Sequence, residues 1–150
     1  MTLRDFLNNG DVFAKNMGAK ITDIREGYAR AEMVVTKDHL NAGGVCQGGA
    51  IFTLGDLAFA AISNSRGKLT FGLENTIAFL HSAFEGDVLV AEAVETLNHH
   101  KIPYCEIKVK NQHGDLICTM TGLAYRKDKP MVLLILWAPV WFRSSRFRYS

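Results

Sequence analysis

The residues around position 48 could perform acyl chemistry. Gln47, Gly48 and Gly49 stand where an apolar helical pattern begins. Backbone N–H groups at a helix start lack intrahelical partners, and the helix dipole adds positive charge there. Glycine lets a ligand approach the backbone closely, so this helix start could stabilise the oxyanion of a tetrahedral acyl intermediate. A glycine needed only for close packing is the alternative.

Asp56 is the lone acid of the same apolar segment. Its neighbours Gly55, Leu57, Ala58 and Phe59 leave little solvated surface. A buried carboxylate is costly unless it is hydrogen-bonded or has a function. Burial also favours its protonated form, which suits a general base or nucleophile near neutral pH. A structural Asp56 that reaches solvent or an arginine is the alternative.

The spacing of these two groups constrains how they could cooperate. Gly48 and Asp56 lie eight positions apart, which is ~12 Å along a helix axis. One helix therefore cannot apply both groups to the same bond. In two antiparallel copies, Gly48 of one chain would face Asp56 of the other. If the two residues act together, the sequence favours a two-fold dimer with paired sites across its interface.

The surrounding sequence predicts the elements that position these groups. Residues 47–64 are apolar on nearly all sides, which is typical of a buried helix, and residues 2–15 predict a shorter helix. Strand patterns cover 19–35, where the turn "REGY" separates two strands, and then 70–82, 87–98, 103–111 and 116–126. Strands joined by turns imply an antiparallel sheet, so we expect an α+β domain whose long helix covers one face of the sheet.

Composition limits the classes of function. A chain of 150 residues with 21% charged residues is typical of one globular domain. The net charge of +2 is too small to indicate nucleic acid binding. The sequence begins without a secretory signal pattern, and its three cysteines have no paired spacing, so we expect reduced thiols in a cytoplasmic protein. The pair His99-His100 lacks a third ligand at useful spacing, so no metal site is predicted.

The end of the chain differs in character from the rest. Residues 131–142 are apolar throughout, and "RSSRFRYS" after them is basic. A membrane-spanning helix needs about 20 apolar residues, so this run, broken by Pro139, does not qualify. We expect a domain at residues 1–130 and a tail at 131–150. The tail is expected to dock on the sheet or join an oligomer contact, with disorder or membrane contact as the alternatives.

Residues 41–65 resemble the central segment of hotdog-fold thioesterases of the PaaI-like branch. The spacing of that branch is kept by Asn41, Gly44, Gln47, Gly48, Gly49 and Asp56. The likeness continues through "ENTIAFLHSAFEGDVLVAEA" and "HGDLICTMTGLAYRK", over about residues 10–128. The resemblance implies a hotdog fold, with an antiparallel sheet wrapped around one long helix. It also implies hydrolysis of acyl-CoA thioesters with no cofactor, since coenzyme A belongs to the substrate.

The resemblance also assigns roles by position. It implies that the Gly48 N–H donates to the thioester carbonyl oxygen. It also implies that Asp56 of the partner chain activates water or attacks the thioester directly. Asn41 and Gln47 would orient the water or the carbonyl. Many relatives have histidine where this chain has Gln47, and glutamine cannot titrate near neutral pH.

The same resemblance indicates where the substrate lies. The pantetheine arm is expected along the strand after the helix, with Gly49 at the helix start and backbone bonds at Asn75, Thr76, Ile77, Ala78 and Phe79. The CoA phosphates would need basic groups at the rim, for which the candidates are Arg66, Lys68, Arg126 and Lys127. Candidates for the lining of the acyl pocket are Ile51, Leu54 and Phe59.

The resemblance predicts a homodimer, or a dimer of dimers, that acts on acyl-CoA without a nucleic acid or membrane partner. Two alternatives stay open. One is a non-catalytic hotdog protein that binds or senses acyl-CoA, in which Asp56 is structural. The other is a hotdog dehydratase or hydratase, which is disfavoured because residues 47–65 contain no histidine.

Overall fold

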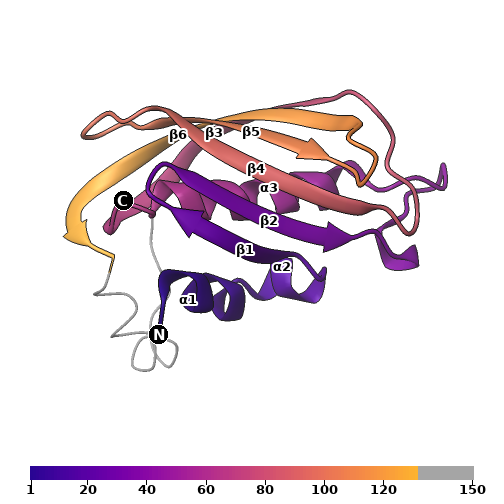
Figure 1. The fold of residues 1–150 in the computed structure, drawn as a ribbon, viewed down its shortest axis with the longest axis horizontal. Helices are drawn as coiled ribbons and strands as arrows, with labels where there is room; N and C mark the ends of the chain where they lie inside the picture. Colours follow the sequence, from indigo (N-terminus) through magenta and orange to yellow (C-terminus); the bar gives the residue numbers. More distant parts are fainter. Residues whose placement is uncertain (132–150) are drawn as a thin grey trace.

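The computed structural model describes residues 1–131, which form one antiparallel sheet curled around a central helix (Figure 1). The six strands lie in the order β1-β2-β4-β5-β6-β3. In chain order the elements are α1 (Leu3–Gly10), α2 (Val12–Asn16), β1 (Lys20–Arg25), β2 (Tyr28–Val34), a 3₁₀ turn (Lys37–His39), α3 (Gly48–Ser63), β3 (Lys68–Phe79), β4 (Val88–Leu97), β5 (Tyr104–Lys110) and β6 (Leu116–Pro130). The predicted α+β arrangement is confirmed.

The central helix α3 packs unusually close to the sheet, and two glycines permit this. A Cβ atom at Gly55 of α3 would overlap the Met120 sulfur, and one at Gly122 of β6 would overlap the Phe59 ring. Ten of the helix's residues are buried, so its nearly all-round apolar pattern matches its environment. The inward-facing Cys105, Ile107 and Val109 of β5 are buried as their alternation predicts.

The N-terminal helical segment differs from the single helix predicted over residues 2–15. Asp11 ends α1, and its side chain caps α2 by accepting from the Ala14 N–H at 3.0 Å, so the segment forms two helices. Phe13, on α2, is 68% exposed. Asn8 fastens α1 to β1 by two hydrogen bonds with the Ile21 backbone, at 2.8 and 3.0 Å.

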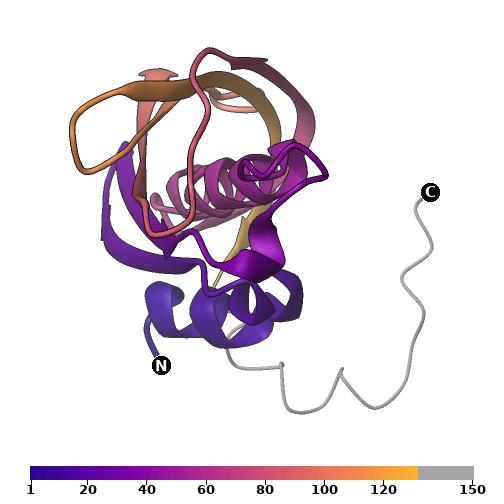
Figure 2. The same ribbon diagram turned by 90° about the vertical axis from the view of Figure 1, so that its right-hand side faces the viewer.

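The curl of the sheet has an open side. Figure 2 shows the sheet passing around α3, with α1 and α2 lying beneath the central helix. Strand β3 is one edge of the sheet, and within the described residues it pairs only with β6. The predicted site residues Gly48, Gly49 and Asp56 therefore lie on α3, and those from Asn75 to Phe79 lie on this edge strand.

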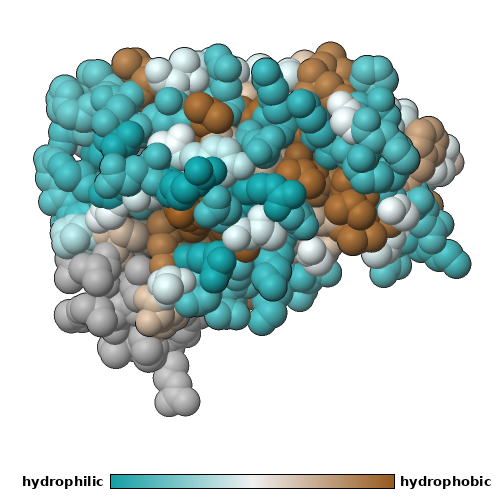
Figure 3. Space-filling view, in the orientation of Figure 1, coloured by the Kyte–Doolittle hydropathy of each residue, from teal (hydrophilic) through white to brown (hydrophobic). Residues whose placement is uncertain are grey.

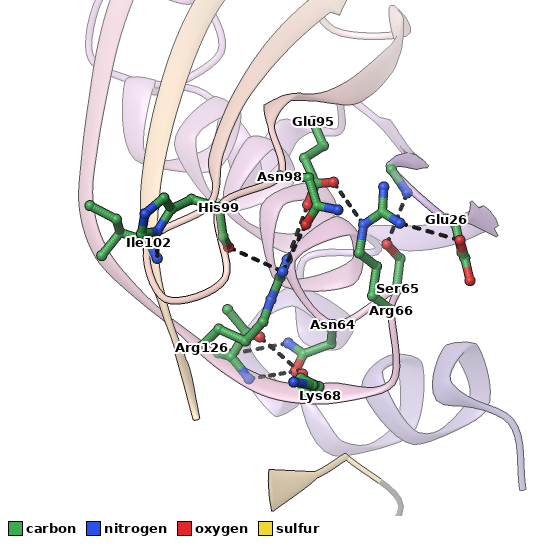
Figure 4. A network of polar contacts seen from close by, with 12 residues as sticks. Glu26, Asn64, Ser65, Arg66, Lys68, Glu95, Asn98, His99, Ile102 and Arg126 are labelled. Carbon is green, nitrogen blue, oxygen red and sulfur yellow. Dashed lines mark hydrogen bonds and ion pairs between the residues drawn. The ribbon is translucent and has the colours of Figure 1, made fainter. Parts of the chain in front are cut away.

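A buried ionic network closes the end of α3 opposite Gly48 (Figure 4). The Glu95 carboxylate on β4 receives the Arg66 Nε at 2.8 Å and an Arg126 Nη at 3.1 Å. The Glu95 and Arg126 side chains are 2% and 6% exposed. Because an unpaired buried charge is strongly destabilising, each of these side chains requires the other.

The outer face of the sheet is mostly hydrophilic. In Figure 3 a hydrophobic group lies where β2 ends and β4 begins. At these strand ends Val34 pairs with Val88, and Val34 is 52% exposed. No helix among residues 1–131 is both long enough and apolar enough to cross a membrane. Met131 continues past β6 and donates its N–H to the Gly67 carbonyl at 2.8 Å. The remainder of the expected tail, 132–150, lies outside the described residues, so its docking stays a prediction.

Candidate active site

The start of α3 carries two hydrogen-bond donors that have no acceptor among the described residues. Gln47 caps the helix: its Oε1 accepts from the N–H groups of Gly49 at 2.5 Å and Ala50 at 3.2 Å. These donors fix the orientation of the side-chain amide, so Nε2 points away from the helix. The Gly48 N–H also lacks an acceptor in residues 1–131. Gly48 and Gln47 Nε2 can therefore serve an incoming oxygen, whereas the Gly49 N–H is already bound.

Asn41 organises the loop that leads into this helix. Its Oδ1 accepts from the N–H groups of Gly43 at 2.8 Å and Val45 at 3.3 Å, and its own N–H donates to the Val45 carbonyl at 2.8 Å. The side-chain oxygen is thus occupied within the loop, and the Nδ2 group is the part of Asn41 left for a ligand.

Phe79 lies against the same helix start. A Cβ atom placed on Gly48 would lie only 3.0 Å from the Phe79 Cζ. The ring is 52% exposed and covers one side of the Gly48 backbone. Sequence reasoning assigned only the backbone of Phe79 to substrate binding and did not predict this contact.

Asp56 lies in the middle of α3, half-buried, and its Oδ1 accepts from the Asn75 Nδ2 at 2.8 Å. The pKa of its carboxyl is raised above the ordinary value, chiefly because burial removes water; the Asn75 bond opposes the rise, and the nearby charge of Asp11 adds to it. Such a carboxylate is a stronger base than an exposed one, which fits a residue that must take up a proton near neutral pH.

Asn75 therefore does more than sequence analysis assigned to it. Its Oδ1 is buried and has no hydrogen-bond partner among the described residues. The contact with Asp56 joins residues 19 positions apart on different elements, and nothing in the spacing of the sequence indicates it. The neighbouring Thr76, Ile77 and Ala78 pair with β6 on one side, and the other side of β3 faces no strand in residues 1–131.

Replacement of Asn75 with Ala should change the pH dependence of the reaction. The hydrogen bond from Asn75 lowers the pKa of Asp56, so its loss should raise that pKa. The ionised base should then be reached only at higher pH, and the acid limb of the kcat/KM profile should move upward in pH. A pH series of kcat/KM for wild type and variant measures this. An acid limb at the same pH in both proteins would contradict a role of Asn75 in setting the basicity of Asp56.

The structure brings the candidate residues together in two groups. Gly48, Gln47 and Phe79 meet at the start of α3, and Asp56 and Asn75 meet two turns further along. Both groups belong to the continuous helix Gly48–Ser63, so they are separated by ~12 Å along its axis. Within one chain they cannot act on a single carbonyl.

Two expectations about the substrate are wrong. Arg126 is not at an exposed rim: its guanidinium is buried and bound to Glu95, to Asn98 Oδ1 at 2.8 Å and to the His99 carbonyl at 3.2 Å (Figure 4). The buried carboxylate of Glu95 demands such a partner. Ile51 and Leu54 face the core between helix and sheet, whereas Phe59 lines a pocket beside Asp56.

Two other kinds of site are not supported. Cys46 stands next to Gln47, but burial raises the pKa of its thiol to about 11, so it is protonated at neutral pH and a poor nucleophile. His99 accepts from the N–H groups of Lys101 and Ile102 at 3.2 and 3.0 Å and so shapes a turn. Residues 1–131 contain no cluster of three or more His, Cys, Asp or Glu side chains placed to hold a metal.

Comparison with known proteins decides the family. Residues 43–118 match the family model of the thioesterase superfamily. The chain belongs to the thioesterase superfamily. The matched range contains α3 and both groups of candidate residues, and Asn41 precedes it by two positions.

Relatives of this superfamily cover most of the chain. A protein of Archaeoglobus fulgidus is 44% identical over 127 residues, which are 85% of this chain and 82% of that protein. The acyl-coenzyme A thioesterase PaaI of Escherichia coli is 34% identical over 116 residues, 77% of this chain and 83% of the relative. The solved structure of the E. coli PaaI protein superposes with a TM-score of 0.76 at 30% identity, over 86% of this chain and 99% of that one. The hotdog fold and the PaaI-like resemblance are confirmed.

Proposed function

We propose that this protein hydrolyses acyl-CoA thioesters at a site shared between two copies of the chain. The observation that carries the proposal is the half-buried Asp56, which Asn75 holds at 2.8 Å and whose pKa is raised by burial. A half-buried carboxylate in an apolar helix costs free energy, so its presence fits a role as a general base. The similarity to a relative named acyl-coenzyme A thioesterase supports the substrate class.

The proposed reaction uses both groups of residues. Asp56 takes a proton from water, whose oxygen forms a bond with the thioester carbon. The carbonyl oxygen becomes an oxyanion and accepts from the Gly48 N–H and the Gln47 Nε2 of the second copy. The carbon–sulfur bond then breaks, and the sulfur of CoA leaves with the proton held by Asp56. Direct attack by Asp56, followed by hydrolysis of the resulting anhydride, uses the same residues.

Edge strand β3 supports a two-fold dimer. It is 12 residues long and has no second neighbour within the described residues. Its exposed hydrophobic side chains include Phe71, Leu73 and Phe79, and such an edge is a ready template for pairing with another strand. Two β3 strands paired about a two-fold axis would bury these side chains and lay the two α3 helices antiparallel. Gly48 of one copy would then face Asp56 of the other.

Substrate binding at this edge follows from the same geometry. The pantetheine arm would lie along Thr76, Ile77 and Ala78, at outer-side backbone groups that the pairing of the two β3 strands leaves without a partner. The exposed Lys68 and Lys127 are the remaining candidates for the CoA phosphates. The proposal also includes a cytoplasmic location, which is supported by the free thiols of Cys46, Cys105 and Cys118. It further includes assembly as a dimer of dimers.

A substrate panel tests the proposed activity. The purified chain is incubated with acetyl-, hexanoyl-, dodecanoyl- and phenylacetyl-CoA, and release of free thiol is followed, while light scattering gives the molecular mass. We expect turnover of at least one thioester by a dimer or a larger even assembly. Binding of acyl-CoA without turnover of any member would favour a sensor, and an active monomer would contradict the shared site.

A further inference from the structure

A pocket of about 280 Å³ runs along one face of α3 from Asp56 toward the end of the helix. Four of its lining residues, Asp56, Phe59, Ala60 and Ser63, follow the spacing i, i+3, i+4, i+7 and so form one stripe of the helix. Asp56 lies at one end of the stripe, and Ser63 lies ~10.5 Å further along the axis.

The opposite walls of the pocket are apolar and come from three separate segments. Phe6 and Leu7 belong to α1, Phe71 to β3, and Met131 to the residue after β6. Helix α1 is held against β1 by Asn8, which makes two hydrogen bonds with the Ile21 backbone, and its first turn is stabilised by a capping box between Thr2 and Asp5. Both α1 and Met131 lie outside the range 43–118 that matches the family model, so these walls are contributed by other parts of the chain.

Ser63, which lines the pocket at its far end, has a buried hydroxyl without a hydrogen-bond partner in residues 1–131. The residue is 2% exposed. Its polar neighbours Asn64 and Thr70 bind each other through the Asn64 amide at 2.9 and 3.1 Å. A buried hydroxyl that is left unpaired is costly, and Ser63 lines a cavity large enough for a ligand. The missing partner can therefore be supplied by a bound molecule.

From these contacts we infer, on the basis of the thioesterase function proposed above, that the pocket holds the acyl group and selects short acyl groups with a hydrogen-bonding group at their far end. The scissile carbonyl lies beside Asp56, the carbon chain lies between the α3 stripe and Phe6, and the polar tip meets Ser63. The volume is at the lower limit of ligand pockets, which begin near 300 Å³, so long fatty acyl groups are excluded by the α1 wall.

Matched substrates test the polar end of the pocket. The kcat/KM values of hexanoyl-CoA and ω-hydroxyhexanoyl-CoA are compared, and the wild type should prefer the hydroxylated substrate about tenfold, because a site built to hydrogen-bond a substrate hydroxyl discriminates against the analogue that lacks it. Ser63→Ala should abolish the preference, so that the two substrates have equal kcat/KM values in this variant. Equal kcat/KM values for the two substrates in the wild type would overturn the assignment of Ser63.

Truncation of the α1 wall tests the size limit. Phe6→Ala should raise kcat/KM for dodecanoyl-CoA relative to hexanoyl-CoA about tenfold, because it opens the pocket. Phe13→Ala is the matched control, since Phe13 is exposed on α2 and is not among the lining residues. Circular dichroism shows whether each Phe6 variant is folded. If α1 unfolds in Phe6→Ala, the milder Phe6→Leu is used in its place. An unchanged chain-length profile in a folded Phe6 variant contradicts the inference, whereas a wild type inactive on every thioester contradicts the proposed function itself.

Discussion

Asp56→Asn should abolish hydrolysis while the protein stays folded and still binds acyl-CoA. A positioned general base contributes about 10²–10⁴ in rate, so we expect kcat to fall by about that factor with little change in substrate affinity. Asparagine is nearly isosteric with aspartate, and its side-chain oxygen can still accept from Asn75, so the local packing is retained. Thiol release measures kcat, and calorimetric titration with a non-hydrolysable acyl-CoA analogue measures affinity. A variant with wild-type kcat would remove Asp56 from the mechanism.

The same variant should be more stable than the wild type at neutral pH. The pKa of Asp56 is raised in the folded chain, so folding favours its protonated form. The wild type therefore has its full stability below the ordinary aspartate pKa and loses part of it as pH rises through the raised value. Asparagine does not titrate, so its advantage should grow over that interval. Thermal unfolding of both proteins across acid to neutral pH checks the sign, and a less stable variant at neutral pH would indicate that Asp56 is held for structural reasons.

Much of the fold could be predicted from the sequence because local pattern and burial agree. The apolar run that predicts a helix over 47–64 is observed as Gly48–Ser63, because a helix enclosed by a sheet must be apolar on all faces. The alternation of apolar and polar residues predicts a strand over 103–111, and the observed β5 differs from this range by one residue at each end. The glycines at the start of α3 and the lone acid within it likewise indicate the candidate site, because each residue is unusual in its own local context.

The parts that escaped prediction depend on partners distant in sequence. Asn75 meets Asp56 only because β3 returns along α3, and a polar residue on an edge strand gives no sign of that contact. Arg126 reads as one of several basic residues near the chain end, yet it pairs with the buried Glu95 on β4. Asp11 could have been recognised as a cap inside the first helical segment, since its residue type is typical of a helix start.

Removal of the Gly48 N–H should be nearly as damaging as the loss of Asp56. Gly48→Pro deletes the donor at the first position of α3, where the backbone of a helix tolerates proline. Loss of one oxyanion donor typically costs about 10²–10³ in kcat. The matched control is Gly48→Ala, which adds a Cβ against Phe79 as proline does but keeps the N–H. The difference in kcat between the two variants isolates the contribution of the donor, and equal kcat values would contradict the proposed oxyanion site.

Mixed dimers of these variants should recover activity that neither variant has alone. In a dimer of one Asp56→Asn chain and one Gly48→Pro chain, one site receives both its intact Gly48 and its intact Asp56, and the other site receives neither. Random assortment makes half of the dimers mixed, so coexpression should restore roughly a quarter of wild-type activity per chain, as two-fold symmetry requires. Differently tagged chains allow the mixed species to be purified and assayed. Both residues lie on one helix, ~12 Å apart. A site contained within one chain predicts no recovery at all, because each chain of the mixed dimer carries one of the two defects. An inactive mixed dimer would therefore rule out the shared site.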